Sequence, residues 1–264
     1  MNEIITSTKN PKIKRLMLLQ QKSAERRKEG VFIVEGCQEV MHCIHNGMQL
    51  ITLYYCKSLW NEDHTPILPH ATLCMEVTEK VYEKMAYRGS TEGLIAEVRT
   101  RVLTLSDISL SKTPLIIVLE KVEKPGNLGA VLRSADAAHA DAVIVCDPLT
   151  DIFNPNIIRS SVGAIFTVPC VACTSEECIS FLKNNHIQIL TAQLQDSRLY
   201  YDIDMRRSTA IIMGTEATGL TQRWREVADD HIRIPMLGQI DSLNVSVSSA
   251  ILLFEAVRQR QSDK

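Results

Sequence analysis

The chain has 264 residues, 45% of them hydrophobic, and a formal net charge of -2 at pH 7. This composition is typical of a globular protein with one large or two modest domains, and it argues against indiscriminate binding to nucleic acid. The first residues, MNEIITSTKNPKIK, lack the apolar core of a signal peptide, and no run of about 18 uncharged apolar residues could span a membrane. We therefore expect a soluble, cytoplasmic protein.

The first predicted element is a basic helix that begins at Asn10-Pro11 and ends before Gly30. Its buried stripe is predicted at Ile13, Leu16, Met17, Gln20 and Ala24. The basic residues of this segment would then face mostly solvent: Lys9, Lys12, Lys14, Arg15, Lys22, Arg26, Arg27 and Lys28. Two interpretations remain open, an ordinary solvated helix face and a phosphate-binding surface.

From residue 31 to about 101, short apolar runs alternate with short helical patterns, which predicts a small α/β unit. Strands are predicted at 31–36, 50–56 and 93–98, and helices at 38–46 and near 78–86. The polar stretch TLSDISLSKTP ends in proline and is typical of a connection between domains. We place the domains at residues 1–105 and 113–264, with a linker at 106–112.

The second domain has a regular rhythm of apolar strands separated by helical stretches. The predicted strands are 115–120, 142–147, 166–171, 187–192, 210–214 and 231–236. Continuous Val/Ile/Leu strands of this kind indicate a parallel sheet covered by helices on both faces. Ligands bind such sheets at the carboxyl ends of the strands, so the loops that follow strands are the places to search.

The loop after the first of these strands leads into PGNLGAVLRSA. It contains neither GxGxxG nor GK[ST], so the standard dinucleotide and triphosphate sites are poorly supported. Asn127 precedes a predicted helix whose core face includes Leu128 and Val131, which places Arg133 and Asp136 on the opposite side. A guanidinium there could bind a phosphate through two oxygens, or it could form an ordinary surface ion pair with Asp136.

Two further loops carry polar residues at the same predicted edge of the sheet. TEATGL places Glu216 between Gly214 and Gly219, where it could serve a ligand site or cap the next helix. DSLNVSV begins a C-terminal helix, because Leu243, Val247, Ala250, Ile251, Phe254 and Val257 recur at helical spacing. Ser242 is the predicted N-cap. We expect the three loops to converge on one edge of one sheet.

The eight cysteines lie singly in apolar segments, as reduced thiols do. Cys170 and Cys173 form one isolated CxxC, and no second CxxC or closely spaced histidine pair supplies the further ligands that zinc normally takes. We expect thiols that pack in the core, and no metal site.

The three motifs PGNLGAVLRSA, MGTEATGL and IPMLGQIDSLNVSVSSAILLFEAVRQR, in this order, resemble the SpoU (TrmH-like) family of RNA 2'-O-ribose methyltransferases in the SPOUT superfamily. The resemblance covers residues 113–264 and includes NPNIIRSSVGAIFTVP. The segments NPKIKRL, FIVEG and TEGLIAEV are similar to the family's L30e-like RNA-binding domain, although Glu92 stands where relatives commonly carry glutamine.

The resemblance has consequences for the fold and the cofactor. Strand order alone would predict an unknotted doubly wound sheet. Family members instead have a deep trefoil knot, with S-adenosylmethionine bent among the knotted loops. The resemblance implies that Gly214, Ile234, Met236 and Leu243 bind the cofactor here, with Asn244 organising the turn.

Ribose methylation depends on positioning and on stabilising the developing alkoxide. The resemblance implies that Arg133 binds the neighbouring phosphate and stabilises negative charge on O2', since a guanidinium is an improbable base. Asn127 would orient Arg133 or the ribose, Glu216 would brace its loop, and Ser242 and Asn244 would complete the pocket. The predicted RNA-binding residues are Lys9, Lys12, Lys14, Arg15, Arg26, Arg27 and Arg133.

Family members are homodimers with active sites near an interface that includes the C-terminal helix. Leu252, Leu253 and Ala256 widen the apolar surface of that helix here, which fits either a dimer or a broad core face. The predicted substrate is 23S (large-subunit) rRNA, and the alternatives are tRNA and a non-catalytic RNA-binding assembly protein. The sequence does not indicate which nucleotide is modified.

Overall fold

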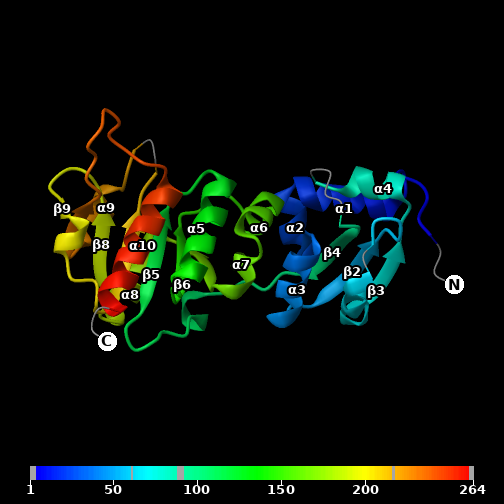
Figure 1. Ribbon diagram of the computed structural model, residues 1–264, viewed down its shortest axis with the longest axis horizontal. Coiled ribbons are helices and arrows are strands. Elements are labelled where there is room, and N and C mark those ends of the chain that lie inside the picture. Colours follow the sequence, from blue (N-terminus) through cyan, green and yellow to red (C-terminus); the bar gives the residue numbers. More distant parts are fainter. Residues whose placement is uncertain (1–3, 61, 88–91, 216–217, 262–264) are drawn as a thin grey trace. The chain divides into compact units, whose positions relative to one another are not determined.

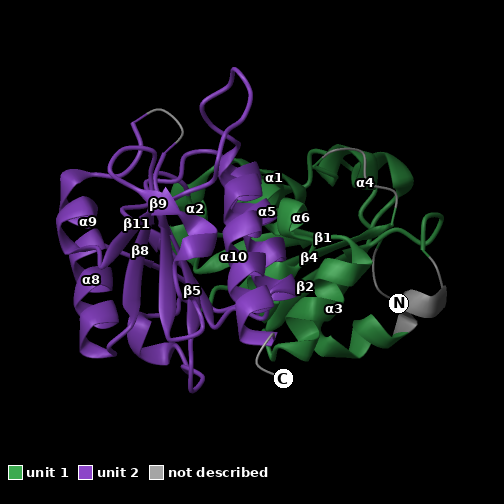
Figure 2. Ribbon diagram, turned by 60° about the vertical axis from the view of Figure 1, so that its left-hand side comes forward, with its two compact units in different colours: residues 1–101, 151–167 green, residues 102–150, 168–264 purple. Residues whose placement is uncertain are grey.

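The chain divides into two compact units (Figure 2). The computed structural model describes residues 4–60, 62–87, 92–215 and 218–261. Unit 1 contains residues 1–101 and 151–167, and unit 2 contains residues 102–150 and 168–264. No described helix is both long enough and apolar enough to cross a membrane. The boundary at residues 101–102 comes before the predicted linker at 106–112, and residues 151–167 pack with the first unit instead of the second.

Unit 1 has a four-stranded mixed sheet in the order β1-β4-β2-β3. Its strands are β1 (Val31–Glu35), β2 (Leu50–Tyr55), β3 (Ala71–Glu76) and β4 (Leu94–Arg99). β4 is antiparallel to both β1 and β2, and β3 pairs with β2 in parallel at the edge. The three predicted strands are confirmed. β3 was not predicted, because this edge strand has only one buried residue and lacks a continuous buried apolar run.

Short helices surround this sheet: α1 (Pro11–Gln21), α2 (Ser23–Glu29), α3 (Cys37–His45), η1 (Glu62–His70), α4 (Glu79–Met85), α6 (Pro155–Ser161) and α7 (Ala164–Thr167). The single helix predicted before Gly30 is wrong, because Lys22 is extended (φ -118°, ψ 112°) and separates α1 from α2. The break changes the direction of α2. Ala24 is consequently exposed, and Arg26 turns inward.

Arg26 forms a buried ion pair that joins α2 to residue 151. Its side chain is only 4% exposed, and its Nε lies 2.7 Å from Oδ2 of Asp151. Its Nη1 also donates to the carbonyl oxygen of Leu19 at 2.6 Å. The prediction that Arg26 faces solvent and binds RNA is therefore wrong, since its donors are used inside unit 1.

Aromatic packing holds residues 151–167 against β1. The ring of Phe32 stacks on Phe153 with centroids 4.7 Å apart and on Phe166 at 5.9 Å. Gly163 has φ +83°, and a β-carbon there would lie 2.5 Å from the ring of His42 in α3. The segment fits closely because residue 163 lacks a side chain.

Unit 2 has a seven-stranded sheet in the order β7-β6-β5-β10-β8-β11-β9, and every pair is parallel (Figure 1). The strands are β5 (Leu115–Glu120), β6 (Ala142–Cys146), β7 (Cys170–Cys173), β8 (Gln188–Ala192), β9 (Arg198–Leu199), β10 (Thr209–Met213) and β11 (Asp230–Arg233). The predicted parallel sheet is confirmed. The strand predicted at 166–171 is displaced, because α7 includes Thr167 and Pro169 has no amide hydrogen for pairing.

Helices cover both faces of this sheet, with α5 and α10 on one side and α8 and α9 on the other (Figure 2). The helices are η2 (Leu105–Asp107), α5 (Pro125–Ala137), α8 (Ser175–Asn184), η3 (Tyr200–Asp202), α9 (Gln222–Val227) and α10 (Val245–Gln261). Ile108 is buried in the core with Ile116 and Ile144, so residues 106–112 pack on unit 2 instead of forming the predicted linker. The threading of the predicted knot stays a prediction.

The strand order places a switch point between β5 and β10. From β5 the chain continues to β6 and β7 on one side, whereas β8, β11 and β9 lie beyond β10 on the other. Loops that leave neighbouring strands in opposite directions open a crevice at the carboxyl ends of those strands. The loops after β5 and β10 are therefore the natural walls of a ligand site.

α10 begins at Val245, so its cap lies two residues after the predicted cap at Ser242. Asn244 is the actual cap, because its Oδ1 accepts hydrogen bonds from the amide of Ser246 at 3.0 Å and from its hydroxyl at 2.6 Å. The buried face carries Ser249, Leu252, Leu253 and Ala256. The predicted stripe is largely on the other side, where Val247 and Phe254 are each 47% exposed. Both faces are apolar, so helical spacing alone could not identify the buried one.

Replacing Arg26 by methionine should destabilise unit 1 by about 3–5 kcal/mol, because the carboxylate of Asp151 would be left in a largely buried site without its counterion. Urea unfolding followed by circular dichroism measures the loss, and hydrogen exchange in α6 locates it. Arg27→Met is the matched control, since Arg27 is the exposed neighbour on α2. Equal effects of the two substitutions would contradict the buried pair.

Candidate active site

A cavity of about 410 Å³ opens at the carboxyl ends of β8, β10 and β11. Its walls are the loops after these strands and the first turns of α10. The expectation that the loops after β10 and β11 converge is confirmed by this lining. The loop after β8, residues 192–195, was not predicted to take part, although its position after a strand of the same sheet was a usable signal.

Most of the predicted cofactor residues line this cavity. They are Gly214, Ile234, Met236 and Leu243, together with Ser242. Asn244 lies at the start of α10, and its Nδ2 donates to Oδ1 of Asn127 at 3.2 Å. This bond joins the beginning of α10 to the first turn of α5, two predicted site residues that are 117 positions apart in sequence.

The loop after β10 is a tight hairpin that requires glycine at position 214. A β-carbon on Gly214 would lie 2.3 Å from the carbonyl carbon of Gly219 and 2.5 Å from the amide nitrogen of Leu220. Two backbone hydrogen bonds join Thr215 and Gly219, at 3.0 and 3.2 Å. The predicted role of Glu216 concerns a residue that lies outside the described part of the chain.

Two buried polar atoms face this cavity. Within the described residues, Nε of Arg225 and Oε1 of Gln193 have no hydrogen-bond partner, and both side chains line the cavity. Buried polar atoms are normally satisfied, so a donor and an acceptor at one cavity indicate a polar ligand. Sequence reasoning missed both residues, because neither belongs to a recognisable motif. The lining also includes the apolar side chains of Leu220, Ile232 and Leu252.

A second cavity, of about 110 Å³, lies on the β5 side of the same hairpin. It is lined by Asn127 and residues 119–124, and it shares Gly214, Thr215 and Val245 with the larger cavity. Glu120 is 2% exposed, and its carboxylate accepts from the amide and hydroxyl of Thr221 at 2.8 and 2.7 Å. This pair fixes Thr221, the residue that precedes α9, to the end of β5.

Arg133 lies on the exposed face of α5, and it lines neither cavity of its own chain. The predicted core face of α5 is confirmed, since Leu128, Val131 and Leu132 are buried. The helix begins at Pro125, so Asn127 lies within its first turn, and six residues of helix separate it from Arg133 by about 9 Å along the axis. The structure therefore brings Asn127 and Asn244 together and leaves Arg133 on the surface.

The basic residues of unit 1 divide into two groups. The following are exposed as predicted: Lys9, Lys12, Lys14, Lys22, Arg27 and Lys28. Arg15 is half-buried instead, and its guanidinium pairs with Glu29 at 2.5 Å and with the buried Glu97 at 2.8 Å. The prediction that Arg15 mainly faces solvent is therefore wrong.

Glu92, the departure from the family pattern, lines an acidic pocket of about 120 Å³ in unit 1. Its Oε2 accepts from the amide of Cys37 at 2.5 Å, at the N-terminus of α3, where an anion is favourable. Glu39 lines the same pocket, where burial raises the pKa of its carboxyl and the negative charge of Glu92 adds to the rise. Glu92 thus binds the N-terminus of α3 directly through its carboxylate.

Two regions of the chain match known families. Residues 114–254 match the SpoU rRNA Methylase family, and residues 10–96 match the MRM3-like substrate binding domain. The first match covers unit 2 apart from its ends, and the second lies wholly within unit 1. The expected family is confirmed, and so is the expected parallel-sheet domain preceded by a substrate-binding domain.

Known proteins resemble almost the whole chain. The 23S rRNA (guanosine-2'-O-)-methyltransferase RlmB of Vibrio parahaemolyticus is 34% identical over 82% of this chain and 92% of its own. The 23S rRNA (guanosine(2553)-2'-O)-methyltransferase RlmP of Bacillus subtilis is 29% identical over 95% of this chain and 97% of its own. The AdoMet-bound rRNA methyltransferase of Sinorhizobium meliloti, 29% identical, superposes with a TM-score of 0.88 over 97% of each chain. The chain belongs to the SpoU rRNA methylase family.

Proposed function

We propose that this protein transfers a methyl group from S-adenosylmethionine to the 2'-hydroxyl of a ribose in 23S (large-subunit) rRNA. The observation that carries the proposal is the cavity of about 410 Å³, whose walls are formed by the family's second and third motifs and which holds a buried unpaired donor and acceptor. The relatives from Vibrio parahaemolyticus and Bacillus subtilis are named as 23S rRNA methyltransferases, which supports the same substrate here. We also propose that the protein is located in the cytoplasm, where such RNA is found.

The cavity fits S-adenosylmethionine in both shape and polarity. Leu220, Ile232 and Leu252 offer an apolar surface for an adenine ring, and Gly214 permits close approach to the backbone. Nε of Arg225 would donate to the carboxylate of the methionine portion, and Oε1 of Gln193 would accept from an amino group. When bound, the cofactor supplies an activated methyl group on a sulfonium.

The smaller cavity beside the hairpin is our candidate for the ribose. Asn127 lines it and is held by Asn244, so the amide pair would orient the ribose next to the methyl donor. Glu120 acts at one remove as a positioning residue, since it keeps Thr221 and the hairpin in place. Ser242 lines the larger cavity and would complete the site on the cofactor side.

Arg133 would bind the phosphate next to the reacting ribose. It is permanently charged, exposed and located on the helix that begins with Asn127. Arg133 lines neither cavity of its own chain. We therefore propose that it serves the site of a second copy of the chain, packed on the helix layer to which α5 belongs. Clamping the phosphate and stabilising charge on O2' suit a guanidinium, which cannot accept a proton.

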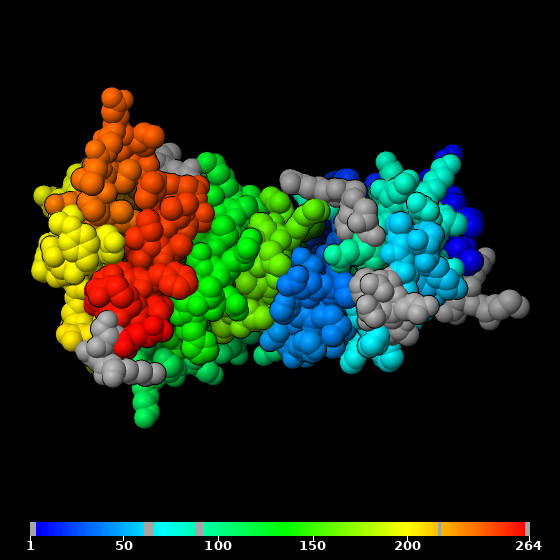
Figure 3. Space-filling view, in the orientation of Figure 1, coloured from blue at the N-terminus to red at the C-terminus, as the bar shows by residue number. Residues whose placement is uncertain are grey.

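We propose a homodimer that buries the outer face of α10. Val247 and Phe254 lie two turns apart on that face, and Ile251 lies between them partly exposed, which forms an apolar stripe. In Figure 3 the red spheres of α10 lie at the surface of unit 2, beside the orange loop that precedes the helix. That loop includes Leu237 at 98% exposure, so it extends the apolar area.

Unit 1 would bind the RNA around the modified nucleotide. Six exposed cations between residues 9 and 28 offer phosphate contacts, and residues 10–96 match a substrate binding domain. This combination supports a large structured RNA as substrate. Binding by these residues should weaken as salt concentration rises.

Arg133→Ala should lower methyl transfer to 23S rRNA at least about 100-fold, because a lost contact to transition-state charge costs roughly 3 kcal/mol. Its Kd for S-adenosylmethionine should change less than about twofold. The assay is transfer of a labelled methyl group to rRNA from a strain lacking the gene, with ribose-methylation mapping of that strain and its parent. Lys183→Ala, an exposed change on α8, is the control. No difference between the two maps would contradict the proposed function.

Arg225→Gln should weaken binding of S-adenosylmethionine at least about tenfold, since the charge-assisted hydrogen bond to its carboxylate contributes about 1.5–3 kcal/mol. Binding of adenosine, which has no carboxylate, should stay within about twofold. Calorimetry measures both affinities. Arg223→Gln on the same helix is the control, because Arg223 is exposed and lines neither cavity. A parallel loss of both affinities would mean that Arg225 only supports the fold.

Phe254→Arg should convert the dimer to a monomer at micromolar concentration, because the apolar stripe on α10 would gain an unpaired charge. Sedimentation equilibrium measures the mass. Tyr201→Arg is the matched control, since Tyr201 is likewise 47% exposed in unit 2 but lies in η3. A monomeric wild-type protein under the same conditions would overturn the dimer.

A further inference from the structure

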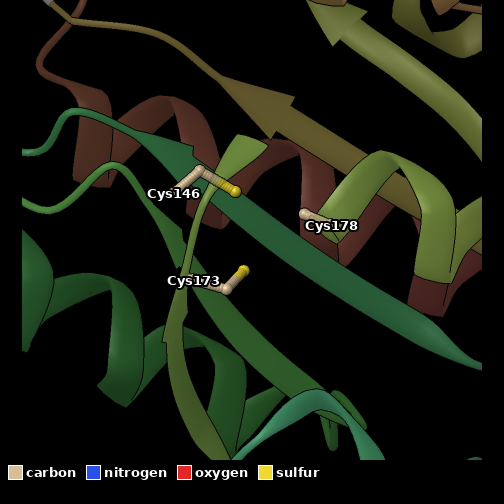
Figure 4. Close-up of side chains that lie close together, drawn as sticks. All are labelled: Cys146, Cys173 and Cys178. Carbon is tan, nitrogen blue, oxygen red and sulfur yellow. The ribbon is translucent and has the colours of Figure 1, made fainter. Parts of the chain in front are cut away.

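Three cysteine thiols converge at the carboxyl end of the unit 2 sheet, and none of them lines either cavity described above (Figure 4). Cys146 ends β6, Cys173 ends β7, and Cys178 lies one turn into α8. Their three sulfur atoms all lie within 4.8 Å of one another. β6 and β7 pair in parallel with Cys146 opposite Cys173, so the sheet itself sets the first two sulfurs side by side.

This cluster differs from the CxxC that the sequence contains. Cys170 and Cys173 are three positions apart on one strand, so their side chains point to opposite faces of β7. Cys173 therefore joins the thiols of β6 and α8, while Cys170 stays on the other face. We expected no metal site because no further ligands lie at close spacing to the CxxC. Cys146 lies 27 positions before Cys173 in the chain, so local spacing could not identify it as a ligand.

We propose that Cys146, Cys173 and Cys178 bind one Zn²⁺ ion, with water as the fourth ligand. Thiolate sulfur is a preferred zinc ligand at about 2.3 Å, which places the sulfurs of a tetrahedral site about 3.8 Å apart. The sulfurs need to move together by about an ångström or less to reach that spacing. Cys146 and Cys178 are buried and Cys173 is partly exposed, so the open coordination position is on the Cys173 side.

Zinc binding releases the thiol protons. Thiolate is the form of cysteine that binds the metal, so a sulfur–zinc bond replaces the sulfur–hydrogen bond at each of the three residues, and the protons pass to solvent. Zinc binding by this cluster should therefore weaken as pH falls. The N-terminus of α8, near Cys178, favours a thiolate.

Neighbouring polar groups are already engaged and hold the cluster in place. Asp147 accepts from the hydroxyl of Ser175 at 2.6 Å, and Ser175 accepts from Nε1 of Trp224 at 3.2 Å. Glu177 accepts from the amide and hydroxyl of Thr174 at 2.8 Å in a capping box. Because both carboxylates have these partners, water is the better candidate for the fourth position. Zinc would fasten β6, β7 and α8 together.

The test uses the full-length protein, stripped of metal and kept reduced with a phosphine. Addition of Co²⁺ as a spectroscopic probe should give a thiolate-to-metal charge-transfer band that saturates at one equivalent and disappears when Zn²⁺ is added. Cys173→Ser should weaken Zn²⁺ binding at least 100-fold in competition with a chromophoric chelator. The control is Cys170→Ser, on the same strand but the opposite face, which should stay within twofold of wild type.

A second measurement covers the case in which Cys173→Ser loses its fold. In wild-type protein, one equivalent of Zn²⁺ should protect Cys146, Cys173 and Cys178 from alkylation and leave Cys37 and Cys74 reactive, as mapped by peptide mass. The absence of a charge-transfer band, an equal loss in the Cys170→Ser control, or no selective protection would each overturn the site and identify the thiols as core packing.

Discussion

The close approach of two backbone segments after β10 is the constraint on which the site depends. At Gly214 the chain comes so near to Gly219 and Leu220 that a β-carbon would lie 2.3 Å from a carbonyl carbon. Gly214 and Thr215 line both cavities, so the two cavities share this hairpin as a wall. Glu120 holds its far end through Thr221. A larger residue at 214 would deform both cavities together.

The parts of the fold that the sequence predicted well are those determined by local patterns. Buried parallel strands such as β5 and β10 are uninterrupted apolar runs, and their carboxyl ends mark the edge where ligands bind. The three motifs that follow such strands therefore led to the correct family and to loops that do meet around a cavity. Gly214, Ile234, Met236 and Leu243 line it, as their motif positions implied.

The predictions that failed depended on contacts between distant residues. Arg26 looks like any exposed cation in sequence, and only Asp151, 125 positions away, explains why it is buried. Both faces of α10 are apolar, so spacing could not decide whether Phe254 or Leu253 meets the core. Arg225 belongs to no recognisable motif. Only the folded structure shows that its Nε has no partner among the described residues and that its side chain lines a cavity with the loops after β8 and β11.

The exchange of residues 151–167 between the units links their folding. The chain passes between unit 1 and unit 2 at residues 101–102, 150–151 and 167–168, so unit 1 is completed only after β5 and β6 have been made. Without that segment, Arg26 would be buried without a counterion and the ring of Phe32 would lose both stacked partners. Both losses are costly. Unit 1 is therefore not an independent module at the start of the chain, because a segment from within the second half of the chain supplies part of its core.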